Sequence, residues 1–240
     1  MKIIIEKDHY SLSKVLAWEI VQYINRNPGS LICLAAGETP LATFAELIDL
    51  QKRGAVNLAD VDYVGLDEWQ GVGYETCGSC ARTMRDALYS PAGIPESNLL
   101  LWDGLKDAHS QRSDIEKWIK SHGGIGLALL GIGMNGHIGF NEQGTDPEAL
   151  TSVVTLDEIT VRVGKKYFSD ADVPTVGMTV GIKALSESKC IFLAASGESK
   201  ASVVRGALWG PATNTLPVSL IMGRPSLCLY IDKPLWDVLG

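Results

Sequence analysis

Short apolar runs alternate with amphipathic segments along most of the chain, and this alternation constrains the fold more than any other feature. LICLAA (31–36), IGLALL (125–130) and CIFLAA (190–195) have the length and composition of buried strands. Between them, apolar residues recur every three or four positions, as on one face of a helix. Strands that alternate with helices favour a mainly parallel sheet covered by helices on both faces. We therefore predict an α/β chain with a Rossmann-like three-layer fold.

Turn and capping residues give approximate bounds to these elements. A helix is expected over 11–25, and a second helix is expected to begin at Pro40 with Thr39 as its N-cap. No internal repeat or linker interrupts the pattern, so one domain spanning 1–240 is the simplest prediction. The other predicted elements are a strand beginning at residue 2, strands at 62–66, 216–221 and 226–231, helices at 80–89, 110–122 and 199–208, and a strand leading into a short helix at 178–185.

Length and charge exclude several classes of protein. A chain of 240 residues with 46% apolar and 20% charged residues can bury a substantial core. The net charge of -7 argues against broad binding to nucleic acid or to acidic membranes, although a local basic pocket for a small anion is compatible with it. No run of 18 apolar residues predicts a membrane span, and the first ten residues do not form a secretory signal. We expect a cytoplasmic protein.

The five cysteines do not form a recognisable metal or disulfide framework. Cys33, Cys190 and Cys228 lie in apolar, strand-like runs, which is typical of buried reduced thiols. Cys77 and Cys80 form a single C-x-x-C pair, which is half of a zinc site, and no second pair with suitable spacing follows. We expect no metal, and a redox role for this pair is the weaker alternative.

Polar residues follow four of the apolar runs, at the points where the strands should end. In open α/β sheets, ligands bind beyond the carboxyl ends of the strands. We therefore expect these four stretches to converge at one rim of the sheet. They are Gly37-Glu38-Thr39, Asp67-Glu68-Trp69, Gly131 to Glu142, and Ser196 to Lys200.

Two of these stretches have the character of an anion site. Gly37 to Thr39 joins a strand to a helix N-terminus, where N–H groups and the helix dipole favour a phosphate. Glu38 would repel that phosphate unless its side chain points away. Lys200 lies in the first turn of a predicted helix, and its charge opposes the dipole unless an anion compensates for it. An ordinary capped turn and a solvated lysine are the simpler alternatives.

The other two stretches carry candidate acid–base groups. Successive side chains of an extended segment point to opposite sides, so one of Asp67 and Glu68 can face a pocket. His137 and Glu142 follow on a glycine-rich segment that can bend tightly and approach a ligand. Each residue alone is compatible with a structural role. As a set they suit general acid–base chemistry, which needs a histidine oriented by a carboxylate and a separate base.

Together these stretches resemble the glucosamine-6-phosphate deaminase family, also called the glucosamine-6-phosphate isomerases. LICLAAGETPLATF, VGLDEW, LGIGMNGHIGFNEQGT and SGESKA occur in the family's order from about residue 11 to 230. The G-x-G-x-x-G-H-I-x-F-N-E segment is the specific signal. The glycine-threonine-proline turn and the Asp-Glu pair are shared with 6-phosphogluconolactonases.

The resemblance implies a reaction and a role for each matching residue. Family members convert an amino-sugar 6-phosphate to a 6-phosphoketose and ammonia without a metal or redox cofactor. By this resemblance Asp67 is the base that moves a proton between C2 and C1, His137 protonates O5 to open the ring, and Glu142 is coupled to His137. The substrate-binding set that the resemblance and the turns suggest is Gly37, Glu38, Thr39, Gly136, Lys200 and, by a looser match, Lys166.

One departure from the usual family pattern concerns Asn135. Glucosamine enzymes usually have aspartate here, and asparagine can neither take a proton nor supply negative charge. We expect Asn135 to orient the imidazole of His137 by a hydrogen bond instead. Asn135, Trp69 and the Thr76-Cys77 pair resemble the galactosamine-6-phosphate branch, so galactosamine 6-phosphate is favoured over its glucose epimer.

Two alternatives belong to other functional classes. A 6-phosphogluconolactonase is disfavoured by Trp69 and by the F-N-E that follows His137. A non-catalytic sugar-phosphate sensor would require a DNA-binding segment, and the first strand-like segment already begins at residue 2. The expected partner is a small sugar phosphate, with neither nucleic acid nor membrane. Some longer family members are hexamers, which leaves a homo-oligomer open.

Overall fold

The computed structural model describes residues 1–168 and 172–240, and its centre is a parallel sheet. The strand order is β1-β10-β9-β6-β2-β3-β5, and every neighbouring pair is parallel. This confirms the predicted mainly parallel α/β fold. The strands are β1 (Lys2–Glu6), β2 (Leu31–Leu34), β3 (Asp62–Gly65), β5 (Leu99–Leu100), β6 (Leu127–Gly131), β9 (Cys190–Ala195) and β10 (Leu227–Asp232).

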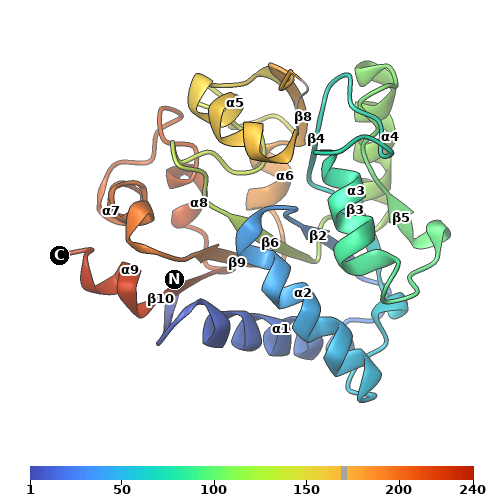
Figure 1. Cartoon of the computed structure of the whole chain (residues 1–240), viewed down its shortest axis with the longest axis horizontal. Helices are drawn as coiled ribbons and strands as arrows, with labels where there is room; N and C mark the ends of the chain where they lie inside the picture. The colour runs from blue at the N-terminus through green and yellow to red at the C-terminus, as the bar shows by residue number, and fades with distance from the viewer. Residues whose placement is uncertain (169–171) are drawn as a thin grey trace.

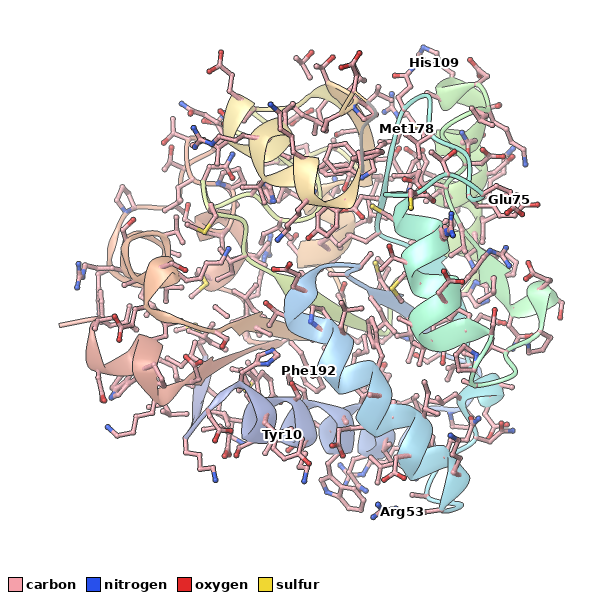
Figure 2. The ribbon with its side chains drawn as sticks, viewed as in Figure 1. Tyr10, Arg53, Glu75, His109, Met178 and Phe192 are labelled. Atoms are coloured by element: carbon pink, nitrogen blue, oxygen red, sulfur yellow. The ribbon has the colours of Figure 1, made fainter. Side chains whose placement is uncertain are left out.

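Helices cover both faces of this sheet. On one face α1 and α2 lie side by side, and Phe192 of β9 belongs to the core that they cover (Figure 1, Figure 2). On the opposite face α4, α6, α7, α8 and α9 bury their apolar side chains. The helices are α1 (His9–Arg26), α2 (Glu38–Lys52), α3 (Cys80–Met84), α4 (Ala108–Ser121), α5 (Glu158–Gly164), α6 (Ile182–Ser186), α7 (Ala201–Trp209), α8 (Ser219–Met222) and α9 (Lys233–Asp237).

Alternation along the strands divides the core into two layers. In β2, Ile32 and Leu34 pack under α1 and α2, while Leu31 and Cys33 belong to the opposite layer. All four side chains are almost completely inaccessible to solvent. Burying one such aliphatic side chain contributes about 1.5–3 kcal/mol, so a strand buried on both faces is strongly held in register. This fixed sheet positions the loops at its carboxyl edge.

A second, smaller sheet stands at that edge and was not predicted. Its order is β4 (Asp67–Trp69), β8 (Val176–Val180) and β7 (Thr151–Thr155), all antiparallel. The chain passes from the main sheet into the small one at Leu66, whose carbonyl accepts a 2.8 Å hydrogen bond from the Val180 N–H. Trp69, Phe140 and Phe168 form the aromatic core of this unit, with Trp69 edge-on to both phenyl rings.

Two sequence predictions at element boundaries are wrong. Residues 216–221 were predicted to be a strand, but α8 forms because Val218, Ile221 and Met222 recur at helical spacing and are buried together. Thr39 was predicted to cap a helix beginning at Pro40. The helix α2 instead begins at Glu38, and the extended backbone of Gly37 takes the N-cap position without a side-chain hydrogen bond.

The other helical predictions are confirmed with shifted ends. The predicted helix 80–89 is α3 followed by a π-helical turn, Arg85–Tyr89. The predicted helix 199–208 is α7, which begins after a 3-10 turn, Glu198–Lys200. Further 3-10 turns are Leu58–Asp60, Glu96–Asn98 and Lys165–Tyr167. Across residues 1–168 and 172–240, the helices are too short or too polar to cross a membrane.

Candidate active site

A pocket of about 230 Å³ opens at the carboxyl edge of the parallel sheet. The segments after β2, β3 and β6 line it, as the sequence predicted, and the fourth predicted stretch contributes Lys200. Helix α5 closes the remaining side with Ile159, Thr160 and Val163, which were not predicted to be there. The polar lining residues are Glu38, Thr39, Asp67, Cys80, Thr83, His137, Thr160, Lys166, Tyr167 and Lys200.

Asp67 is the carboxylate of the Asp-Glu pair that faces the pocket. Burial, reinforced by the charge of Glu68, raises its pKa from 3.8 to about 7, while the Cys80 thiol and the charge of His137 act in the opposite direction. A carboxyl group with such a pKa changes protonation state near neutral pH. Asp67 can therefore accept a proton from a bound ligand and return it.

Glu68 points the other way and is completely buried. Its two oxygens accept hydrogen bonds from the Ser79 hydroxyl at 2.6 Å and from the Trp69, Cys80 and Ala81 N–H groups at 2.9–3.0 Å. These contacts join β4 to the first turn of α3. Glu68 therefore stabilises the wall of the pocket beside Asp67 and does not itself line the pocket.

Two glycines let the catalytic candidates sit close to the main chain. A Cβ on Gly133 would lie 2.2 Å from the imidazole ring of His137. A Cβ on Gly139, whose φ is +54°, would lie 2.7 Å from the Thr179 hydroxyl and 3.3 Å from an Asp67 carboxylate oxygen. The glycine-rich segment after β6 is therefore needed to bring His137 and Asp67 into one pocket.

His137, Thr160 and Glu142 form a hydrogen-bonded group behind the pocket surface. The His137 Nδ1 lies 3.0 Å from the Thr160 hydroxyl and 3.3 Å from Glu142 Oε1. The Thr160 hydroxyl donates to the same carboxylate at 2.5 Å. Burial would raise the pKa of Glu142, but the hydrogen bond and charge of His137, followed by the hydrogen bonds from Thr160 and Asn135, outweigh burial and lower it. Glu142 therefore stays charged beside the imidazole.

Asn135 supports this group without touching the imidazole. Its Nδ2 donates to Glu142 Oε2 at 2.8 Å, and its Oδ1 accepts from the His137 backbone N–H at 3.3 Å. The expectation that Asn135 orients the ring directly is therefore wrong. Thr160 makes that contact, and the sequence offered no signal for it because Thr160 lies on α5, an unpredicted helix, 18 residues after Glu142.

The other end of the pocket has the properties of an anion site. The first N–H groups of α2 have no partner within a helix, and Thr39 lines the pocket beside them. Lys200 donates from Nζ to the Ile132 carbonyl at 2.6 Å. Burial, and next the charge of Lys166, lower the pKa of Lys200. An anion bound here would offset both the burial of the Lys200 ammonium group and its repulsion by Lys166.

Glu38 and Lys166 form an ion pair at this end of the pocket, 2.8 Å apart. Both side chains are substantially exposed, so the pair itself adds little stability. Glu38 alone would repel a phosphate, but in this pair the positive charge of Lys166 balances the charge of the carboxylate. Gly136 does not line the pocket. It holds a turn with φ of +85° under Leu216 and so positions the neighbouring His137.

Cys77 and Cys80, the two cysteines of the C-x-x-C pair, lie in different surroundings. Cys77 is exposed and Cys80 lines the pocket, and the two thiols are not joined. Burial, followed by the charges of Asp67 and Glu68, raises the pKa of Cys80, which opposes a reactive thiolate. Within residues 1–168 and 172–240, no group of three or more His, Cys, Asp or Glu residues is arranged to hold a metal ion.

A parallel sheet with acid–base groups and an anion site at its carboxyl edge defines an enzyme-type pocket for a small anionic substrate. The chain belongs to the family described as glucosamine-6-phosphate isomerases/6-phosphogluconolactonase, which matches residues 9–229. Glucosamine-6-phosphate deaminases of Thermoanaerobacter pseudethanolicus and Clostridium tetani are each 34% identical to it over 97% of this chain and over 93% and 98% of their own lengths. The chain is therefore an enzyme.

Solved structures support the same assignment. A monomeric glucosamine-6-phosphate deaminase of the NagB superfamily superposes with a TM-score of 0.95 at 32% identity, with 100% of both chains covered. A 6-phosphogluconolactonase from Thermotoga maritima superposes with a TM-score of 0.77 at 20% identity, over 97% of this chain and 99% of that one. The latter likeness shows a common fold.

Proposed function

We propose that this enzyme converts an amino-sugar 6-phosphate to the 6-phosphoketohexose and ammonia. The observation that carries the proposal is the combination found in one pocket. Asp67, with a pKa of about 7, and His137, supported by Glu142, lie beside an anion site formed by the start of α2 and Lys200. The named relatives, glucosamine-6-phosphate deaminases, support the same reaction.

The anion site would hold the 6-phosphate of the substrate. Gly37 and Thr39 bring the N–H groups of the first helical turn to it, and Lys200 supplies a positive charge from the facing segment. Lys166 adds a second positive charge when the phosphate draws it from Glu38. Fixing the phosphate places the sugar ring over Asp67 and His137, which is how remote binding energy orients a reacting centre.

The reaction then needs two proton transfers that these side chains can perform. His137 Nε2 takes the proton of the anomeric hydroxyl O1 and gives it to the ring oxygen O5 while the C1–O5 bond breaks, which opens the pyranose to an aldehyde. Asp67 removes the proton from C2 and delivers it to C1, while the aldehyde oxygen O1 gains the proton that the amine nitrogen loses, so that C2 becomes an imine carbon. Water adds to C2, the resulting carbinolamine releases ammonia, and the ketone remains. This route needs no metal or redox cofactor.

For the sugar epimer, we propose galactosamine 6-phosphate as the preferred substrate and glucosamine 6-phosphate as the competitor. Support for the former is the resemblance of Asn135, Trp69 and the Thr76-Cys77 pair to the galactosamine branch. The relatives, which are glucosamine-6-phosphate deaminases, favour the latter. Three properties remain predictions: a single domain over 1–240, a cytoplasmic location and a homo-oligomer.

The test is ammonia release by the purified protein, with the two epimers assayed in parallel and 6-phosphogluconolactone hydrolysis as a third arm. Deamination of at least one amino sugar is expected, with a higher kcat/KM for the galactose epimer. Preference for the glucose epimer would refute the substrate proposal alone. Lactone hydrolysis without ammonia release would refute the proposed function.

A matched pair of variants tests the role of Asp67. Asp67→Asn is expected to abolish turnover while sugar-phosphate binding, measured by calorimetry, survives. Asp114→Asn is the control, because that carboxylate lies on α4 with 64% of its side chain exposed. If Asp67→Asn kept most of its rate, the base would have to be another group.

A further inference from the structure

Thr160 occupies an unusual place for a hydroxyl, between the imidazole of His137 and the carboxylate of Glu142. It is 5% exposed and lies on α5, the helix that closes the pocket beside the small sheet. Its oxygen is 3.0 Å from His137 Nδ1 and 2.5 Å from Glu142 Oε1. A hydroxyl has one proton to donate, so the direction of these two hydrogen bonds can be worked out.

The direction follows from Asn135 at the far side of the carboxylate. The His137 backbone N–H can only donate, so the atom of Asn135 that faces it, at 3.3 Å, must be the carbonyl oxygen. The amide nitrogen of Asn135 then points to Glu142 Oε2 at 2.8 Å and donates to it. The backbone N–H of His137 thus fixes the orientation of the Asn135 amide. It follows that Oε2 of Glu142 is an acceptor.

The second oxygen of Glu142 is an acceptor too, because the group is ionised. The Asn135 amide at 2.8 Å, the Thr160 hydroxyl at 2.5 Å and His137 Nδ1 at 3.3 Å converge on its two oxygens. These hydrogen bonds, together with the positive charge of His137 when it is protonated, outweigh the effect of burial and lower the pKa of Glu142. An ionised carboxylate only accepts, so the single proton of the Thr160 hydroxyl goes to Glu142 Oε1. Thr160 must then accept from His137, and the proton of the neutral imidazole must be on Nδ1.

We infer that Thr160 is a positioning residue that holds His137 in the Nδ1–H form and leaves Nε2 to exchange protons with the substrate. The inference rests on the proposed function for the identity of that substrate, whose ring oxygen would receive the proton. Among the residues that the structure describes, no protein group is hydrogen-bonded to Nε2, which lies against Gly133 on the pocket side. The chain of donors runs from His137 through Thr160 to Glu142, with Asn135 donating to the same carboxylate.

The first test needs no substrate. Long-range proton–nitrogen NMR spectra of the ¹⁵N-labelled protein distinguish the two neutral imidazole forms, and His137→Gln identifies the signals of His137 among the four histidines of the chain. In the wild-type protein the neutral ring is expected to carry its proton on Nδ1. A neutral ring with its proton on Nε2 would overturn the inference, because Thr160 would then have to donate to His137.

The second test uses Thr160→Val, which removes the hydroxyl and keeps the shape, with Thr160→Ser as the matched control. Without the hydroxyl the Nδ1 proton retains only the 3.3 Å contact to Glu142, so the Nε2–H form should become populated. With the amino-sugar phosphate that the wild-type enzyme turns over, we expect kcat to fall about 10- to 100-fold, as for a lost hydrogen bond to a charged group, while KM stays within about threefold. Serine should restore both the Nδ1–H signal and kcat.

The two hypotheses fail in different ways. Wild-type spectra and wild-type kcat in Thr160→Val would overturn the positioning role even if the enzyme deaminates amino sugars. Equal loss of kcat in the valine and serine variants, with unchanged spectra, would point to packing alone and would also overturn it. Absence of ammonia release from the wild-type protein, with the Nδ1–H form observed, would refute the proposed function and leave the hydrogen-bond direction standing.

Discussion

Replacing Asp67 with asparagine should stabilise the folded protein above neutral pH even though it removes the proposed catalytic base. Burial, reinforced by Glu68, raises the pKa of Asp67 from 3.8 to about 7 in the folded state. In the unfolded chain the carboxyl group of Asp67 keeps its ordinary pKa. Between these two values the unfolded state has released a proton that the folded state still holds, so each pH unit favours unfolding by about 1.36 kcal/mol.

The magnitude follows from the distance between the two pKa values. Below about pH 3.8 both states are protonated and Asp67 costs nothing, whereas above about pH 7 the full shift of about three units, or about 4 kcal/mol, opposes folding. Asparagine is neutral throughout and escapes this cost. At pH 5 the cost is about 1.5 kcal/mol, so the advantage of Asp67→Asn should grow by about 2.5 kcal/mol between pH 5 and pH 8. The penalty for burying the amide itself cancels in that difference.

The assay is urea unfolding of the wild-type protein and of Asp67→Asn at several pH values from 5 to 8. Asp114→Asn controls for the loss of one negative charge, because its carboxylate lies on the surface. The difference in unfolding free energy between Asp67→Asn and the wild-type protein should rise with pH and level off above about pH 7. A difference that stays flat across this range would refute the reasoning, since it would mean that Asp67 is not destabilised by its surroundings.

Three further variants test other parts of the site. Glu68→Gln removes the like charge beside Asp67, so the acidic limb of the pH profile of kcat/KM should move to lower pH. An unmoved limb would show that the charge of Glu68 does not contribute to the raised pKa of Asp67. Lys200→Met should raise KM about 100-fold with little change in kcat, and unchanged steady-state kinetics would remove Lys200 from the phosphate site. Asn135→Asp places a second carboxylate against Glu142, so it should shift the pH profile or the epimer preference without abolishing turnover. Complete inactivation of a folded variant would reveal a required role of Asn135.

Local sequence patterns predicted the main sheet and the rim of the pocket because both depend on short-range physics. Fully buried parallel strands must be apolar throughout, so 31–36 and 190–195 stood out against their helical neighbours. The carboxyl ends of parallel strands share one edge, which is why Asp67, His137 and Lys200 could be expected in one pocket. These inferences need no knowledge of distant pairings.

The small sheet and α5 could not be predicted in the same way. β4 has three residues and pairs with β8, more than a hundred positions further along the chain, so no local periodicity marks it. β7 is a half-exposed antiparallel strand whose partner is also distant. Thr160 enters the site only through this arrangement, and its role depends on hydrogen-bond partners that sequence spacing does not reveal.

The site separates two carboxylates by their surroundings, and this separation explains why both are needed. Asp67 is half-buried beside Glu68, and its pKa of about 7 lets it accept and return a proton near neutral pH. Glu142 has three donors around it, and these together with the charge of His137 lower its pKa, so it remains charged and holds the imidazole of His137 through Thr160. Environments that push two carboxyl pKa values apart commonly distinguish a base from an electrostatic support. The carboxyl group therefore serves two purposes within one pocket, because the donors and the charge of His137 offset the burial of Glu142, whereas the burial of Asp67 is not offset.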